Sequence, residues 1–99
     1  MASTTELIFH SRFVYADGAI REMVSWKLPQ PSPERPRGFK YRLHYGSVYG
    51  HSVVRYDNEA GKGDHCHLGG RENPYQFRGV EALVADFLRD NEVRGGANP

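Results

Sequence analysis

The residue types with the greatest capacity for chemistry are concentrated in a short polar segment that runs from Arg55 to His67. It reads Arg-Tyr-Asp-Asn-Glu-Ala-Gly-Lys-Gly-Asp-His-Cys-His, and so contains two histidines, two aspartates, an arginine, a lysine and a tyrosine. Histidine exchanges protons near neutral pH, while arginine and lysine stabilise the charge that develops on a phosphoryl group. Such a set suffices for cleaving RNA without a metal ion.

His65 and His67 are central to this hypothesis. They are two positions apart, so on an extended backbone both side chains point to the same side, and Asp64 and Cys66 point to the other. The histidines would exchange protons with the ribose hydroxyl and the leaving oxygen, while Arg55 and Lys62 would stabilise the phosphorane. The candidate catalytic residues are therefore His65, His67, Asp57, Arg55 and Tyr56.

Two other interpretations of the same segment stay open. The His-x-His spacing also suits a metal site, with Asp57, Asp64 or Cys66 as a further ligand. This alternative is weaker, because the chain has no Cys-x-x-Cys or His-Glu-x-x-His frame to supply the three or four ligands that zinc sites need. We therefore predict no metal and no cofactor. The second alternative is a plain hydrogen-bonded loop, since Asp57-Asn58 is a common turn pair and the glycines permit a turn.

The overall composition excludes several classes of protein. The net charge is +1, from 13 basic and 12 acidic residues, so nucleic-acid binding would depend on where the charges lie. Cys66 is the only cysteine, which excludes an internal disulfide, and a lone cysteine on a strand is more often a buried side chain than a nucleophile. No apolar run reaches the roughly 18 residues of a membrane span, and the first residues lack the pattern of a signal peptide. The sequence therefore predicts a cytoplasmic protein that does not enter a membrane.

An antiparallel sheet is predicted to position the polar segment. Residues 7–15 and 19–28 alternate between apolar and polar types, and Asp17-Gly18 between them predicts a hairpin turn. The residues expected to face the core are Leu7, Phe9, Phe13 and Tyr15 in the first strand, and Ile20, Val24, Trp26 and Leu28 in the second. Residues 39–45 show the cleanest alternation, and residues 51–56 are rich in β-forming types.

The second half of the chain predicts less regular structure followed by a helix. Residues 59–73 contain too many glycines for more than a short strand around 65–68. An apolar stripe then predicts an amphipathic helix that ends near Arg94 and covers the aromatic face of the sheet; its members are Val80, Leu83, Val84, Phe87 and Leu88. The predicted fold class is α+β, a four- to five-stranded antiparallel meander with one C-terminal helix, in a single domain over residues 6–94 with a flexible tail at 95–99.

The strand residues opposite the apolar positions predict a basic open face on this sheet. These residues are His10, Arg12, Arg21, Lys27, Lys40, Arg42, His44, His51 and Arg55, with Asp57 as the acidic exception. Such a surface would attract a phosphate backbone. The residues expected to bind nucleic acid are Arg12, Arg21, Lys27, Lys40, Arg42, His44 and Lys62. The alternative is that a solvated face is polar in any case and that basic residues on strands prevent edge-to-edge aggregation.

The order of motifs adds a family resemblance. Arg55-Tyr56-Asp57-Asn58 is followed by a histidine-bearing stretch, by Pro74-Tyr75-Gln76-Phe77, and by a helix with Ala85-Asp86-Phe87-Leu88. With these motifs and its opening hairpin, the chain resembles the TumE-type toxin components of bacterial toxin–antitoxin pairs over most of its length. The matching site positions are Arg55, Tyr56, Asp57, Asn58, His65 and His67. Between Asn58 and His65 this chain has 59–64 where relatives have a longer insert with proline and histidine, so the additional histidines do not carry over.

The resemblance implies a small growth-inhibiting protein encoded beside an antitoxin, a DNA-binding protein of the helix-turn-helix or winged-helix type that binds it and represses the operon. Together with the residues above, it leads to the hypothesis of a toxin that acts on RNA as a metal-independent endoribonuclease. The alternatives are a non-catalytic module that binds RNA or protein and, more weakly, a metal-dependent hydrolase.

Overall fold

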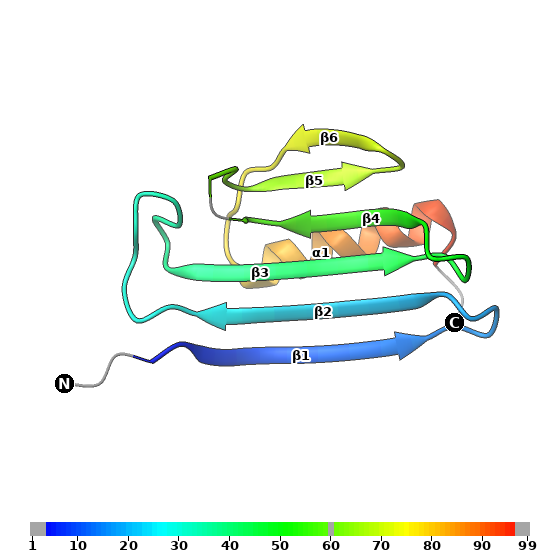
Figure 1. Cartoon of the computed structure of the whole chain (residues 1–99), viewed down its shortest axis with the longest axis horizontal. Coiled ribbons are helices and arrows are strands. Elements are labelled where there is room, and N and C mark those ends of the chain that lie inside the picture. Colours follow the sequence, from blue (N-terminus) through cyan, green and yellow to red (C-terminus); the bar gives the residue numbers. More distant parts are fainter. Residues whose placement is uncertain (1–3, 60, 97–99) are drawn as a thin grey trace.

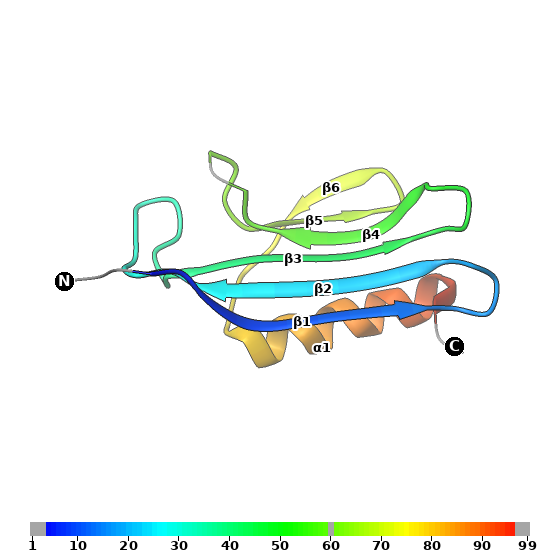
Figure 2. The same ribbon diagram turned by 60° about the horizontal axis from the view of Figure 1, so that its bottom comes forward.

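The computed structural model describes residues 4–59 and 61–96, which form an open antiparallel sheet with a helix on one face (Figures 1 and 2). The strands lie side by side in chain order, each hydrogen-bonded to its sequence neighbour. They are β1 (Glu6–Val14), β2 (Ile20–Lys27), β3 (Phe39–Gly46), β4 (Ser52–Asp57), β5 (His65–Leu68) and β6 (Arg71–Pro74). Helix α1 (Val80–Asn91) continues into a π-helical turn, η1 (Glu92–Gly96).

The β1–β2 hairpin is closed by a three-residue turn. The amide of Tyr15 donates to the Ala19 carbonyl at 2.8 Å, and the amide of Gly18 donates to the Tyr15 carbonyl at 2.9 Å. Gly18 has a φ of 91°, a conformation that glycine adopts without steric cost. Three-residue hairpin loops commonly have this arrangement, a tight turn followed by a left-handed residue. The hairpin predicted from Asp17-Gly18 is confirmed.

The core lies between α1 and the two strands beneath it. Alternate residues of β3 and β4 are buried on this side: Tyr41, Leu43, Tyr45, Val54 and Tyr56. From α1, Leu83 and Phe87 are fully buried, and Val80, Val84 and Leu88 pack around them. The predicted stripe and the predicted covering of the aromatic face are thus confirmed. Of the predicted flexible tail, residues 95 and 96 belong to η1 and residues 97–99 lie outside the described residues.

The sheet has six strands, not the four to five predicted. The additional strand is β6, which pairs with β5 through a turn at Gly69 and Gly70, both with positive φ angles. A Gly-Gly pair is one of the sequences that form two-residue hairpin loops. The glycines therefore form a hairpin turn here and do not prevent regular secondary structure. As a result, β6 places Glu72 directly opposite His67.

The predicted facing of β2 is wrong. Met23 and Ser25 are buried on the helix side, while Val24 and Trp26 lie on the side away from α1, which we call the open face. Leu7 also lies on the open face, because a bulge between Leu7 and Phe9 shifts the register of β1. Phe9 and Phe13 remain on the helix side, as predicted.

Within the described part of the chain, α1 and the other helical segment are too short and too polar to cross a membrane.

Candidate active site

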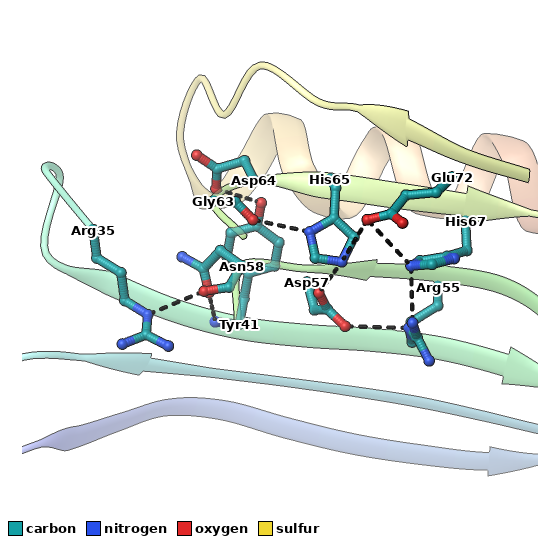
Figure 3. A network of polar contacts seen from close by, with 10 residues as sticks. All are labelled: Arg35, Tyr41, Arg55, Asp57, Asn58, Gly63, Asp64, His65, His67 and Glu72. Carbon is teal, nitrogen blue, oxygen red and sulfur yellow. Dashed lines mark hydrogen bonds and ion pairs between the residues drawn. The ribbon is translucent and has the colours of Figure 1, made fainter. Parts of the chain in front are cut away.

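Four of the five candidate catalytic residues meet on the open face where β4 pairs with β5 (Figure 3). In this register Arg55 lies opposite His67, and Asp57 lies opposite His65. Directly opposed residues of an antiparallel pair share a face, so the four side chains form one cluster. The short strand expected around residues 65–68 is the element that brings the histidines to β4.

His65 has a hydrogen-bond acceptor beside each ring nitrogen. Nδ1 donates to the carbonyl oxygen of Gly63 at 2.9 Å, and Nε2 lies 2.7 Å from Oδ1 of Asp57. A carbonyl oxygen only accepts hydrogen bonds, so Nδ1 carries a proton, and the Asp57 carboxylate lies beside the other ring nitrogen. The pair is buried, with exposed fractions of 4% for His65 and 9% for Asp57.

Arg55 connects this pair to His67. Its Nε lies 3.2 Å from Oδ2 of Asp57, and its Nη2 donates to Nε2 of His67 at 2.8 Å. The guanidinium has no acceptor, so Nε2 of His67 must supply a lone pair, and His67 is neutral. Burial and, next, the positive charge of Arg55 lower the pKa of His67 below its usual range. The two histidines therefore differ in their hydrogen bonding: Nδ1 of His65 donates, whereas Nε2 of His67 accepts.

Glu72 of β6 completes the cluster on its solvent side. Its Oε2 lies 3.8 Å from Nε2 of His65 and 4.0 Å from Nε2 of His67. The side chain of Glu72 is 48% exposed, in contrast to the buried pair beneath it. An anionic oxygen thus already lies near both ring nitrogens, at the side from which a ligand would arrive.

The charged groups of the cluster are close together but incompletely hydrogen-bonded. Oδ1 of Asp57 and Nε of Arg55 are buried, yet neither has a well-aligned hydrogen-bond partner among the described residues. Buried polar atoms without such partners are uncommon, and they are often found at functional sites. The attraction between Asp57 and its neighbours is therefore mainly electrostatic.

Tyr56 does not join the other candidate catalytic residues. It alternates with Arg55 and Asp57 along β4, so its ring is buried on the helix side, and its hydroxyl donates to Asp90 of α1. Burial and then this hydrogen bond raise its pKa. Cys66 faces the same side, where burial raises the pKa of its thiol and makes it unsuitable as a nucleophile. Through its hydrogen bond with Asp90, Tyr56 links α1 to the sheet.

Asn58 and Asp64 hold the loop that leads to the histidines. The Asn58 side chain accepts from the amide of Tyr41 at 3.1 Å and donates to the carbonyl of Phe39 at 2.7 Å, extending the β4 pairing by one residue. Asp64 accepts from the hydroxyl of Tyr41 at 2.6 Å. The first and last residues of the loop are thus tied to β3, which positions Gly63 against the ring of His65. The alternative of a plain loop therefore applies only to the connection between β4 and β5, and this connection supports the cluster.

An open groove of about 750 Å³ continues from the cluster across the open face. It contains Arg55 and Asp57 at one side and Lys62 on the loop. Its other lining residues are Trp26, Arg35, Lys40, Tyr41, Arg42, Asn58 and Glu59. Lys62, Lys40 and Arg42, predicted to bind nucleic acid, therefore lie together beside the histidine cluster.

The remainder of the predicted basic face needs correction. Arg12, Lys40, Arg42 and His44 lie on the open face, with His10. Arg21 lies on the helix side instead, where its guanidinium contacts the rings of Phe13 and Tyr15, and Lys27 follows the same alternation. The cause is the reversed facing of β2. On the open face, the strands also carry two acids besides Asp57, namely Glu22 and Glu72, so this face is less uniformly basic than predicted.

The cluster includes a set of side chains that could hold a metal ion. Among the described residues, the ligand atoms of His65, His67 and Glu72 lie within 4.8 Å of one another. Two histidines and a glutamate are a donor set of catalytic zinc sites. However, ligands at 2.0–2.1 Å in a tetrahedron are about 3.3 Å apart, and Arg55 already donates to Nε2 of His67. A divalent ion would have to displace this cation, so the donor set fits a metal only after rearrangement.

Sequence reasoning missed Glu72, Arg35 and the open-face position of Trp26. Gly69-Gly70 could have identified Glu72, because a two-residue turn centred there places residue 72 opposite residue 67. Arg35 lies in the proline-containing connection between β2 and β3, and its Nε donates to the carbonyl of Asn58 at 3.2 Å. No local signal indicates this long-range contact.

The chain was compared with known protein families, curated proteins and solved structures. The family model described as Toxin TumE matches residues 3–95, nearly the whole chain. No curated protein and no solved structure matches.

Proposed function

Because the chain belongs to the TumE toxin family, we propose that this toxin acts on RNA, as a metal-independent ribonuclease in which His65 and His67 transfer protons. Family membership makes the chain the toxin component of a toxin–antitoxin pair, with a cognate antitoxin as its partner. To this we add several proposals. The toxin acts on RNA, His65 and His67 have catalytic roles, and the toxin acts in the cytoplasm. The antitoxin is a DNA-binding protein of the helix-turn-helix or winged-helix type.

The observation that carries the proposal is the different hydrogen bonding of two neighbouring histidines. His65 lies between the Gly63 carbonyl and the Asp57 carboxylate, and so is suited to donate a proton. His67 accepts a hydrogen bond at Nε2 and is suited to take one. The rings are 5.1 Å apart, and both Nε2 atoms lie near the same carboxylate oxygen of Glu72. General acid–base catalysis needs one group of each kind close to the reacting oxygens.

Glu72 indicates where a phosphate would bind. A phosphate oxygen that replaced the Glu72 carboxylate would lie close to both ring nitrogens and to Arg55. Because the Glu72 side chain is 48% exposed, it can turn towards solvent without disturbing the core. We infer that the incoming phosphate displaces Glu72 and that this opens the buried His65 to the substrate.

In the proposed reaction the ribose 2′ oxygen attacks the adjacent phosphorus, and the bond from phosphorus to the 5′ oxygen breaks. Nε2 of His67 takes the proton of the 2′ hydroxyl as Arg55 turns to the phosphate, and Nε2 of His65 gives a proton to the departing 5′ oxygen. The products are a 2′,3′-cyclic phosphate and a free 5′ hydroxyl. Arg55 and Lys62 stabilise the charge on the phosphorane, and Asp57 keeps His65 protonated.

The test compares His67→Gln with the wild type in a host that lacks the antitoxin. We expect the variant to lose growth inhibition and, as purified protein with a chelator present, to cleave RNA at least about 100-fold more slowly, the usual contribution of a general acid or base. His51→Gln is the matched control, because His51 is exposed in the β3–β4 loop away from the cluster. Wild-type growth inhibition and RNA cleavage in His67→Gln would refute the proposal.

A metal-dependent hydrolase is the second candidate, favoured by the grouping of His65, His67 and Glu72. The same purified protein separates the two candidates. A metal-dependent enzyme would lose cleavage with a chelator and recover it with Zn²⁺ or Mn²⁺, whereas the proposed ribonuclease would keep its activity throughout. RNA that is bound but left intact under all these conditions would indicate the third candidate, a non-catalytic binding module.

A further inference from the structure

Trp26 occupies an unusual position for a large aromatic side chain. It lies half-buried on the open face, between Leu7 of β1 and Lys40 of β3, and no described element covers it. Lys40 Nζ lies 5.2 Å from the centre of the Trp26 ring, within the range of a cation–π contact. Leu7, which is opposite Trp26 on β1, and Val24 line a second hollow of the open face together with Trp26. Such a ring is a flat apolar surface directly beside cations.

The charge of the adjoining groove favours an anionic ligand. Five of its ten lining residues are basic and two are acidic, which leaves a local excess of three positive charges. The basic residues are Arg35, Lys40, Arg42, Arg55 and Lys62. Because Arg55 belongs to both the groove and the histidine cluster, a chain of phosphates lying in the groove would lead to the cluster.

We infer that this groove binds single-stranded RNA, with a base stacked on Trp26 and the neighbouring phosphates on the groove's lysines and arginines. The inference rests on the proposed function and names its substrate class. Proteins that bind single strands combine a basic groove with aromatic side chains on which bases stack. In a duplex the bases are stacked inside the helix and present no free ring face. The stacked base would replace the ammonium of Lys40, which then pairs with a phosphate.

The fluorescence of Trp26 tests the stacking directly, because Trp26 is the only tryptophan of the chain. The probe is an 8-nucleotide single-stranded RNA with 2′-O-methyl riboses, which cannot be cleaved through a 2′ hydroxyl. We expect saturable quenching with this strand and little with the same strand in a perfect duplex. An unchanged signal with the single strand, or equal affinity for the duplex, would overturn the inference.

Variants measure the contribution of the ring to affinity by anisotropy of the labelled strand. Base stacking contributes about 1–3 kcal/mol per base, so Trp26→Ala should weaken binding about 5- to 150-fold at 1.4 kcal/mol per tenfold. Trp26→Phe, which keeps an aromatic ring and the packing against β1, should lose much less. Tyr49→Ala is the control, because Tyr49 is 85% exposed and outside the groove. Wild-type affinity in a folded Trp26→Ala protein would contradict the inference.

The catalytic proposal and the groove assignment can be refuted independently of each other. If His67→Gln binds the probe with full quenching but cleaves nothing, both stand. If the wild type binds the single strand and never cleaves RNA, the catalytic proposal fails and the groove assignment remains. If RNA is cleaved but the Trp26 signal does not respond, the groove assignment fails and the histidine chemistry remains.

Discussion

The open face contains two close carboxylate–histidine pairs with similar nitrogen-to-oxygen distances and different burial. On β1 and β2, Nε2 of His10 lies 2.8 Å from Oε2 of Glu22, and on β4 and β5, Nε2 of His65 lies 2.7 Å from Oδ1 of Asp57. The side chains of the first pair are 50% and 46% exposed, whereas those of the second are 5% and 13% exposed. Nearly the same interatomic distance therefore occurs in two environments.

The difference teaches that a site depends on what surrounds a pair. Water solvates both members of the exposed pair, so either one can lose its partner at little cost. The buried pair has protein on all sides but one, with the Gly63 carbonyl, Arg55 and Glu72 as its further neighbours. Each charge there depends on the others for compensation. Loss of one of these neighbours therefore leaves another charged group without compensation.

The largest expected effect comes from removing one member of the buried pair. Asp57→Ala leaves the buried guanidinium of Arg55 and Nε2 of His65 without their carboxylate neighbour, and breaking a buried pair in this way typically costs about 3–5 kcal/mol. Urea unfolding followed by circular dichroism should show a loss of this size in the free energy of unfolding. A loss below 1 kcal/mol would mean that the buried pair behaves like the exposed one.

The second prediction concerns Arg55, which connects the buried pair to His67 and has no counterpart at the exposed pair among the described residues. Burial and Arg55 both lower the pKa of His67, so Arg55→Gln should raise this pKa towards the ordinary value of about 6.5 without reaching it, because burial remains. In the wild type the unfolded chain binds the His67 proton more tightly, so the folded state loses stability as pH falls below about 6.5. The Arg55→Gln variant should lose less stability than the wild type over this pH range.

NMR titration of the histidine ring protons measures this effect. His44 is the internal reference, because burial and then Arg42 lower its pKa, with Arg55 contributing less. The midpoint of His67 should therefore move more than that of His44. A His67 midpoint identical in Arg55→Gln and the wild type would show that the contact between them does not set its protonation.

The smallest effect is expected at the exposed pair. The hydrogen bond from His10 lowers the pKa of Glu22, so the pair contributes stability at neutral pH that is lost as pH falls through the lowered pKa. With both groups about half exposed, solvent screening limits this contribution to about 0–1 kcal/mol. Glu22→Gln should thus change the free energy of unfolding at pH 7 by less than 1 kcal/mol in the same urea assay, and a loss as large as that of Asp57→Ala would remove the distinction between the pairs.

The candidate site could be predicted from the sequence where its residues are close together along the chain. The two-residue period of a strand places His65 with His67, and Arg55 with Asp57, on one face each. The same period places Tyr56 on the opposite face, although its position within the polar segment suggested that it belonged with the other catalytic candidates. The position of Glu72 could be predicted only by recognising β6, a strand that the glycines before it obscure. The contact of Arg35 with Asn58 joins residues that are 23 positions apart in the chain.

By itself, the sequence determined the alternation of β3, β4 and β5 and the apolar stripe of α1, because these patterns depend only on backbone geometry. The tertiary structure decided which face β2 presents. A three-residue turn pairs odd-numbered residues of β1 with odd-numbered residues of β2, so Phe13 brings Arg21 to the helix side and sends Trp26 to the open face. A turn shorter by one residue would reverse every side chain of β2. Packing also decided the burial of His65, which separates its pair with Asp57 from the exposed one.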